Sequence, residues 1–309
     1  MCGRESGNMN HMKIKKKKGK TSLAISILSF NNQALLKKCL QSIMRNNKEV
    51  NLEVLLVDNA SSDGSAEMVE KDFPQVHLTR NPINVYFIKA HNQNLRKVNS
   101  KFFLVLNEDI EITKGSLKTL LKFMEEYPRV GLVSCRLIDG EGKTDTTCSR
   151  FPYPLDEMFE YSFLGKLIRR LVPLPSIEKR LRHYRYAGWQ RDTIREVEVI
   201  PGSFFLGRKK LLEDVGLFDE RFLLFYEEPD YGIRARTAGW QTVHIGTVHA
   251  RHLRAQGLAK LSPLTRYRLG EHDLLAYYRK HFGILWWLIL WLMLRPNWLY
   301  WHLQAVLKR

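Results

Sequence analysis

Short apolar runs alternate with amphipathic stretches through the first 130 residues of the chain. Four runs have the length of buried strands, at residues 23–28, 54–57, 76–78 and 102–106. The stretches between them, at residues 33–46, 65–71 and 87–98, follow a helical period. Alternation of strands and helices at this spacing predicts βαβ units around a mostly parallel sheet, which is an α/β fold.

The second half of the body is less regular. We predict helices at residues 114–126 and 209–215, a helix ending at Ala238 with Pro229 in its first turn, and strands at 131–138, 196–200, 204–207 and 243–245. Residues 151–191 interrupt this pattern with a segment rich in proline, aromatic residues and arginine. The sequence therefore predicts one α/β domain over residues 21–255, with a basic insertion at 151–191.

The last part of the chain, residues 256–309, is apolar and rich in tryptophan. Residues 282–294 form a run of thirteen apolar residues, a helix of about 20 Å, which is short of the roughly 20 residues that span a bilayer. This segment reads either as a buried core helix or as amphipathic helices in the membrane–water interface, where tryptophan is enriched. We expect the interfacial, membrane-associating segment, and we expect a chain ending at Arg279 to remain folded.

Positive charge is concentrated in three segments. The chain has 49 basic and 32 acidic residues, a formal charge of +17. Residues 1–20 carry +6, residues 164–191 carry +7 and residues 251–309 carry +8, so the remainder carries −4. Such basic appendages suit an anionic membrane surface or a nucleic acid. We expect the membrane and no nucleic acid, because the chain has no recognised nucleic-acid-binding motif and no basic patch on its body.

The polar, lysine-rich arm at residues 1–20 has no apolar region of its own, so it is not expected to be a signal peptide. We expect it to be disordered, with attraction to a membrane surface as the alternative. Residues 1–11 resemble the remnant of an expression tag. The four scattered cysteines, which include no C-x-x-C pair, indicate a reducing compartment and no structural zinc.

Two acidic groups are candidates for chemistry. Asn107, Glu108 and Asp109 follow a buried strand, where oxygen ligands suit a hard divalent cation that also holds substrate phosphates; a solvated loop is the alternative. Glu227 and Glu228 begin a predicted helix, which carboxylates can simply cap. Adjacent like charges after an apolar run also raise a carboxylate pKa, as a general base requires.

Two histidines, His249 and His252, follow the last predicted strand. Such a pair is either structural or ligating. The pattern alone leaves both possibilities open.

Several strings in a fixed order carry a family resemblance. They are I-S-I-L-S-F-N-N-Q, L-E-V-L-L-V-D-N-A-S-S-D-G-S, R-N-P-I-N-V-Y-F-I-K-A-H-N-Q-N-L, F-F-L-V-L-N-E-D and V-G-L-F-D-E-R-F-L-L-F-Y-E-E-P-D-Y-G-I-R-A-R-T-A-G-W. Together they resemble family 2 glycosyltransferases of the Rossmann-like GT-A fold, over about residues 22–255. The chain looks most like the rhamnosyltransferase-like bacterial branch. It departs from the family at Tyr86, where a glycine is usual.

The resemblance implies a nucleotide-sugar site at the carboxyl ends of the strands. In it, Asp58 would read the nucleobase, and Ser29 and Asn31 would line the same pocket. Three further residues, Arg80, Asn84 and Asn92, would lie beside the diphosphate and the sugar.

The same resemblance assigns a metal motif and a catalytic group. Asn107 and Asp109 match an N-x-D form of the metal-binding motif, and His249 matches a histidine that can complete the metal shell. Among the acids of the later motif, Glu228 falls at the position of the base, paired with Glu227, and Asp230 would help to shape that site.

The activity implied is an inverting transfer that depends on Mg²⁺ or Mn²⁺. A sugar would move from a nucleotide-diphosphate donor to a saccharide or lipid-linked saccharide acceptor, in bacterial surface polysaccharide synthesis such as that of O-antigen. The donor could be dTDP-L-rhamnose or a UDP- or GDP-sugar, and the expected location is the cytoplasmic face of the inner membrane. A catalytically inactive GT-A-like binding protein is the main alternative, and a nucleic-acid-binding protein is the weaker one.

Overall fold

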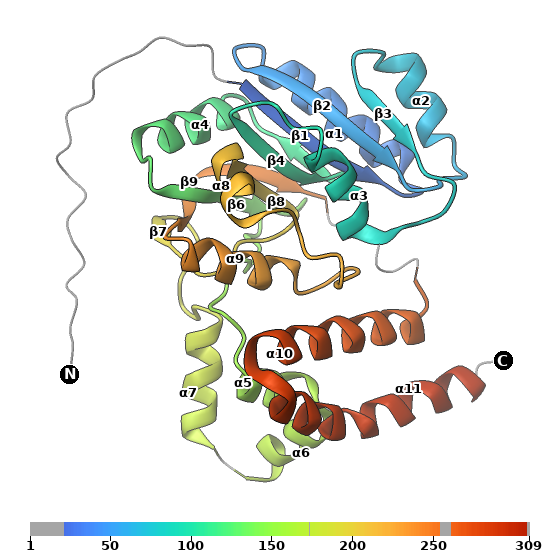
Figure 1. Cartoon of the computed structure of the whole chain (residues 1–309), viewed down its shortest axis with the longest axis vertical. Coiled ribbons are helices and arrows are strands. Elements are labelled where there is room, and N and C mark those ends of the chain that lie inside the picture. Colours follow the sequence, from blue (N-terminus) through green and yellow to red (C-terminus); the bar gives the residue numbers. More distant parts are fainter. Residues whose placement is uncertain (1–21, 173, 254–260, 308–309) are drawn as a thin grey trace.

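The structure is a computed structural model that describes residues 22–172, 174–253 and 261–307 (Figure 1). The predicted arm at residues 1–20, with its suggested tag remnant, lies outside the described residues.

A mixed sheet of nine strands forms the centre of the described chain. The strands are β1 (Ser22–Ser29), β2 (Asn51–Asp58), β3 (His77–Arg80), β4 (Phe102–Asn107), β5 (Ile110–Ile112), β6 (Val130–Ile138), β7 (Ile194–Glu196), β8 (Phe204–Arg208) and β9 (Gln241–His252). Their order is β3-β2-β1-β4-β8-β6-β9-β5, with β7 paired to β9. Strands β3, β2, β1 and β4 are parallel, and β8 runs antiparallel to β4 and β6.

Helices cover both faces of this sheet. One face packs against α1 (Gln33–Asn46), α2 (Ser65–Asp72) and α4 (Ser116–Glu126), and the other against α3 (Tyr86–Leu95), α8 (Lys209–Val215) and α9 (Glu227–Thr237). Each face of the sheet has its own hydrophobic core, and alternate residues of β4 pack into the two cores. Leu104 packs in the first, and Phe103 and Val105 pack in the second. Burial on both faces explains why the strands read as continuous apolar runs. The predicted α/β class is confirmed.

The parallel register brings three strand ends together. Ser29 pairs with Asp58, and Leu28 pairs with Asn107. The polar residues that follow β1, β2 and β4 therefore lie at one edge of the sheet, which is where open α/β sheets place a ligand.

The insertion at residues 151–191 is mostly helical. It forms α5 (Pro154–Tyr161), α6 (Phe163–Leu171) and α7 (Pro175–Tyr184), which lie beside the last two helices, away from the sheet (Figure 1). The first two of these helices contact α10 (Pro263–Met293). The insertion and the C-terminal segment therefore build one layer together.

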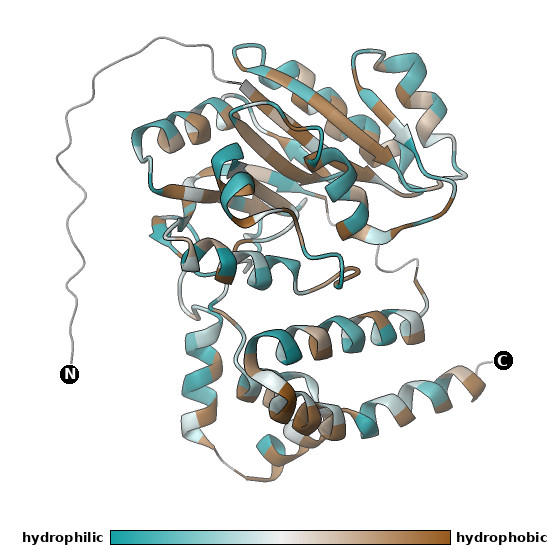
Figure 2. Cartoon of the chain, in the orientation of Figure 1, coloured by the Kyte–Doolittle hydropathy of each residue, from teal (hydrophilic) through white to brown (hydrophobic). Residues whose placement is uncertain are grey.

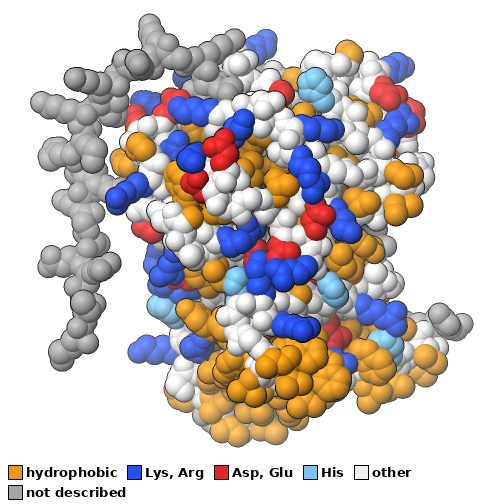
Figure 3. Space-filling view, viewed as in Figure 1, with side chains coloured by type: hydrophobic (Ala, Val, Ile, Leu, Met, Phe, Trp, Pro, Cys, Tyr) orange, Lys and Arg blue, Asp and Glu red, His pale blue; other side chains and the backbone are white. Residues whose placement is uncertain are grey.

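The C-terminal segment divides at Gly283, which interrupts α10 with a φ of 85°. Before this kink, Leu274, Tyr277 and Tyr278 are buried in the core shared with α9. After it, α10 and α11 (Arg295–Leu307) expose many large apolar side chains, which give the lower end of the molecule its apolar surface (Figures 2 and 3). The segment begins as part of the core of the α/β domain and only later becomes an exposed apolar surface.

No single helix in the described residues has the length and apolar composition to cross a bilayer. The pair α10 and α11, bent by 43°, meets these criteria only when the two helices are taken together.

Candidate active site

A cavity of about 550 Å³ lies at the shared edge of β1, β2 and β4. Its polar lining residues include Asn32, Asn59, Asn84, Asn107, Glu108, Asp109, Asp145 and His252, and its apolar ones include Leu28, Phe30, Tyr86, Phe87 and Leu224. Of the predicted binding residues, Asn84, Asn107 and Asp109 line this first cavity. The others lie behind or beside it.

Asp109, His252 and Asp145 form a connected chain at one wall of the first cavity. His252 Nε2 lies 3.3 Å from Asp109 Oδ2, and His252 Nδ1 lies 2.8 Å from Asp145 Oδ2. Both carboxylates are almost fully buried. Two carboxylates, an imidazole and the neighbouring Glu108 concentrate negative charge and oxygen donors at this wall, which fits a hard divalent cation.

The donor set is incomplete for a closed metal cage. Within the described residues, no group of three or more His, Cys, Asp and Glu side chains has the geometry of a complete metal site. Magnesium and manganese sites often use one or two carboxylates and leave the remaining positions to water and substrate phosphates. The residues present fit that open kind of site.

The structure places His252, rather than His249, beside Asp109. His249 is exposed on β9, and its carbonyl accepts a hydrogen bond from Thr113. The reason is that β9 continues past Ile245 to His252 and pairs there with β5, so that Ile110 faces His252. The predicted loop is a strand, and residues three apart on a strand point to opposite faces.

Several predicted residues shape the walls of the first cavity from outside. Asp58 Oδ2 accepts from the Ser61 N–H at 3.0 Å, and Asn31 Oδ1 accepts from the Ser62 N–H at 2.7 Å. Ser29 is fully buried at the end of β1. These contacts hold the turn after β2 against the turn after β1.

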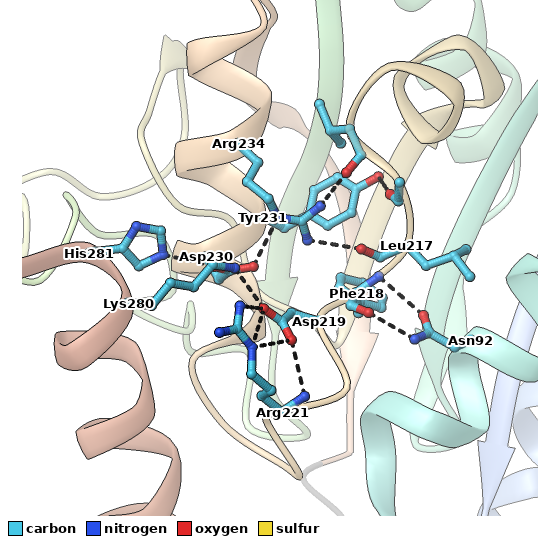
Figure 4. A network of polar contacts seen from close by, with 12 residues as sticks. Asn92, Leu217, Phe218, Asp219, Arg221, Asp230, Tyr231, Arg234, Lys280 and His281 are labelled. Atoms are coloured by element: carbon cyan, nitrogen blue, oxygen red, sulfur yellow. Dashed lines mark hydrogen bonds and ion pairs between the residues drawn. The ribbon is translucent and has the colours of Figure 1, made fainter.

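Arg80 and Asn92 also lie outside the first cavity. Arg80 is half exposed and pairs with Glu67 and Glu70 on α2. Asn92 is fully buried, and its amide donates to and accepts from the backbone of Phe218 (Figure 4). In this structure both residues connect elements of the fold.

Asn59, which the sequence analysis missed, organises the rim of the first cavity. Its amide nitrogen donates to Asn84 at 2.7 Å, and its carbonyl oxygen accepts from the Val85 N–H. The next residue, Tyr86, has a φ of 63°, a conformation that favours glycine. The aromatic ring at this normally glycine position lines the cavity.

The acidic pair Glu227–Glu228 lies at the start of α9, and Glu228 lines a second cavity of about 500 Å³. Glu228 Oε1 accepts from the Gly202 N–H at 2.8 Å. A Cβ at residue 202 would lie 3.0 Å from an oxygen of each glutamate, so a larger residue at this position would press on both carboxyl groups. Gly202 had not been singled out in the sequence.

The two glutamates differ in environment. Burial, and then the charge of Glu228, raise the pKa of Glu227 well above its ordinary value. Burial also raises the pKa of Glu228, and the Gly202 hydrogen bond opposes that rise. Glu227 is 4% exposed whereas Glu228 is half-buried and faces the second cavity. Of the two carboxyl groups, Glu228 is the one that a molecule in the second cavity can reach.

The two cavities adjoin along two chain segments. Thr147 lines the first and Ser149 the second, and likewise Leu224 lines the first and Phe225 the second. The two cavities are therefore lined by neighbouring residues of the same two segments. This arrangement suits a reaction between two bound substrates.

Asp230 lies away from both cavities and is fully buried. Its carboxylate binds Arg234 within α9, and Lys280 and His281 of α10 (Figure 4). Burial alone would raise the pKa of Asp230, but the hydrogen bonds from His281 and Lys280 and the charge of Arg234 lower it overall. Asp230 therefore ties α9, which carries Glu228, to the C-terminal segment.

Comparison with known proteins agrees with this geometry. The family model for glycosyl transferase family 2 matches residues 24–216. An N-acetylglucosaminyl-diphospho-decaprenol L-rhamnosyltransferase of Mycobacterium tuberculosis is 25% identical over 249 residues, 76% of this chain and 77% of its own length. Rhamnosyltransferase WbbL of Escherichia coli is 25% identical over 241 residues, 74% of this chain and 82% of its own.

Solved structures share the fold. A mannosyltransferase of Pyrobaculum calidifontis, solved with GDP-Man and Mn²⁺, matches with a TM-score of 0.54 at 16% identity over 85% of this chain and 64% of its own. The TarS protein of S. aureus, solved with UDP-GlcNAc, matches with a TM-score of 0.51 at 17% identity over 81% of this chain and 65% of its own.

The sheet, its ligand edge and these matches define a GT-A glycosyltransferase fold. The chain belongs to glycosyl transferase family 2 and is rhamnosyltransferase-like. The predicted family and fold are confirmed.

Proposed function

We propose that this protein is an inverting, metal-dependent glycosyltransferase that moves a hexosyl group, L-rhamnose in the first instance, from a nucleoside-diphosphate donor to a lipid-linked saccharide. The observation that carries the proposal is the position of Glu228. This carboxylate faces the second cavity, is held by the Gly202 N–H, and lies on a helix whose preceding segment also lines the first cavity.

The first cavity is the proposed donor site. Asp109, with Asn107 beside it, would hold Mg²⁺ or Mn²⁺ together with the donor phosphates, and His252 would orient Asp109 and Asp145. The cation would neutralise the charge that develops on the leaving diphosphate. The asparagines at the rim offer neutral amides to the nucleoside and the sugar, which suits recognition by hydrogen bonds.

The second cavity is the proposed acceptor site, and Glu228 takes the proton. The acceptor oxygen forms a bond to the anomeric carbon while the bond from that carbon to the diphosphate oxygen breaks. The acceptor proton goes to Glu228, and the electron pair leaves with the nucleoside diphosphate. A single displacement of this kind inverts the anomeric centre and needs no covalent enzyme intermediate.

The acceptor class follows from the relatives and from the surface of this chain. The names of two relatives specify diphospho-decaprenol and PP-undecaprenol substrates. Here the exposed apolar side chains of α6, α10 and α11, among them Leu167, Leu285, Leu292 and Leu303, would rest in the interfacial region of a bilayer. Basic residues nearby would favour anionic lipids, as on the cytoplasmic face of a bacterial inner membrane.

A donor screen tests this function. Purified protein would be titrated calorimetrically with dTDP-L-rhamnose, UDP-GlcNAc and GDP-mannose, in Mn²⁺ and again in EDTA. We expect one donor to bind in Mn²⁺ and to bind at least about tenfold more weakly in EDTA. Equal binding with and without metal would exclude the metal-dependent site, and no binding of any sugar nucleotide would support an inactive homologue.

A further inference from the structure

The second cavity is built by segments outside the core of the sheet. Its walls come from α5 and α6 of the insertion, from the first half of α10, from α11 and from the start of α9. Because one carboxylate of the proposed chemistry faces this space, the residues at its other end decide what kind of molecule fits.

The interior of this cavity is aromatic. Tyr161, Tyr184, Tyr226, Tyr267 and Trp301 all line it. Flat aromatic faces with a few polar groups suit a pyranose ring, which has apolar C–H faces and a polar edge.

Buried acids mark the inner end of the cavity. Glu157 of α5 is 3% exposed, burial raises its pKa to about 8, and its side chain bonds that of Tyr226. Tyr226 directly precedes the Glu227–Glu228 pair. A sugar hydroxyl at this end would meet Glu228.

Two cations mark the outer end. Lys166 of α6 and Arg266 of α10 line the cavity and are exposed to solvent. Among the described residues, neither side chain has a carboxylate partner within ion-pair distance. Ammonium and guanidinium groups left without a protein partner are the usual ligands of phosphate oxygens.

Exposed apolar side chains flank these cations. Leu164 and Leu167 on α6 are 41% and 50% exposed, and Leu299 and Leu303 on α11 are each 53% exposed. The lower end of the molecule, where α6 and α11 lie in Figure 1, has an apolar surface in Figure 3. The mouth of the cavity thus carries two cations surrounded by apolar side chains. This arrangement could bind a lipid that has a negatively charged group at one end.

We propose that the second cavity takes the acceptor with its sugar against Glu228 and with the diphosphate that joins sugar to lipid bound by Lys166 and Arg266. The lipid chain then lies along the apolar side chains of α6 and α11. This inference rests on the proposed function, because that function makes Glu228 the group that meets the acceptor hydroxyl.

The test uses farnesyl diphosphate as a probe of the lipid diphosphate, with farnesol and inorganic diphosphate as the comparison ligands. Binding to the full chain is measured by calorimetry in detergent and in EDTA, so that the metal-dependent donor site does not contribute. Binding of the chosen nucleotide sugar in Mn²⁺ is measured on the same preparations. The variants are K166A/R266A and, as a matched control on α6, R170A, which removes an exposed cation that does not line the cavity.

We expect the full chain and R170A to bind farnesyl diphosphate more tightly than either comparison ligand. K166A/R266A should bind it at least about tenfold more weakly and should bind the nucleotide sugar normally. Unchanged binding of farnesyl diphosphate by K166A/R266A, equal losses in R170A, or equally tight binding of inorganic diphosphate would each overturn the proposal. Failure of nucleotide-sugar binding in the unmodified chain would instead count against the proposed function.

Discussion

His281 of α10 lies with its Nε2 2.8 Å from the carboxylate of Asp230 on α9, two residues beyond Glu228. Lys280 binds the same carboxylate. Asp273, which lies before Lys280 on the same helix, accepts hydrogen bonds from the backbone N–H groups of Leu224 and Phe225, at 2.8 and 2.9 Å. The helix that leads to the apolar surface therefore also holds the segment that presents the proposed base.

Truncation at two points tests this attachment. A chain ending at Arg279 loses two of the three partners of the buried Asp230, keeping only Arg234, and also loses the buried Leu290, so we expect it to lose about 3–5 kcal/mol of unfolding free energy or to fail to fold. A chain ending at Asn297 keeps all of these and should unfold at nearly the temperature of the full chain. Calorimetric melting of both chains gives the comparison, and equal stability would mean that Lys280 and His281 hold nothing in place.

Substitution of His252 and, separately, of His249 tests the proposed metal site beside Asp109. We expect His252→Ala to weaken Mn²⁺-dependent donor binding by about tenfold or more, because it removes the imidazole that orients Asp109 and Asp145. Asp109→Asn should abolish that binding. The control His249→Ala alters an exposed side chain outside the cavity and should bind normally. The opposite pattern would restore His249 as the ligand.

Acid should destabilise the fold through two buried imidazoles. Burial lowers the pKa of His91 to about 3 and that of His244 to about 4. Between pH 6.5 and pH 4 these two imidazoles therefore bind protons in the unfolded chain but not in the folded chain. The free energy of unfolding consequently falls as the pH falls. The slope is at most about 1.4 kcal/mol per pH unit for each imidazole.

Urea unfolding between pH 4 and pH 8 measures this slope. His91→Gln should lower stability at pH 7 but flatten the pH dependence, whereas His77→Gln, at an exposed position, should leave the dependence unchanged. If the stability of His91→Gln depended on pH as steeply as that of the unmodified chain, His91 would not contribute to the acid sensitivity.

The proposed membrane association would depend on the exposed apolar side chains after Gly283. Leu285 and Leu292 are 66% and 61% exposed, so L285E/L292E should fold normally but no longer float with anionic vesicles. Ile194→Glu, at a 46% exposed position on β7, is the matched control and should float. Flotation of the unmodified chain should weaken but persist at high salt, because the apolar contribution is not screened. A chain that never floats would contradict the interfacial assignment.

The regular elements could be predicted because their signal is local. The stripe of Leu36, Leu40 and Ile43 sets α1, and each is fully buried in the core. The three-residue strand β5 and the length of β9 could not be predicted, because Gly246 breaks the alternation where β9 bulges against β6. Because of that error, His249 and His252 were predicted to lie on a loop. The pairing of His252 with Ile110, which places His252 rather than His249 beside Asp109, was therefore missed.

Family motifs located the strand ends but not the partners brought there by distant segments. Asp145 returns to the first cavity through the turn after β6, and Glu157 reaches the second through the insertion. No local sequence pattern identifies Asp145 or Glu157 as a residue that lines a cavity. The expectation that a chain ending at Arg279 stays folded did not take account of Lys280 and His281, because only the packed fold shows that both bind Asp230.

The kcat of Glu228→Gln for transfer to an acceptor is the most direct test of the account. Because Glu228 takes the acceptor proton only as the new bond forms, we predict a fall of about 10²–10⁴-fold in kcat with donor affinity nearly unchanged. Glu227→Gln, which keeps the hydrogen bond between Gly202 and Glu228, should retain far more activity. A Glu228→Gln variant as active as the unmodified chain, or an inactive Glu227→Gln beside it, would contradict the assignment of Glu228 as the base.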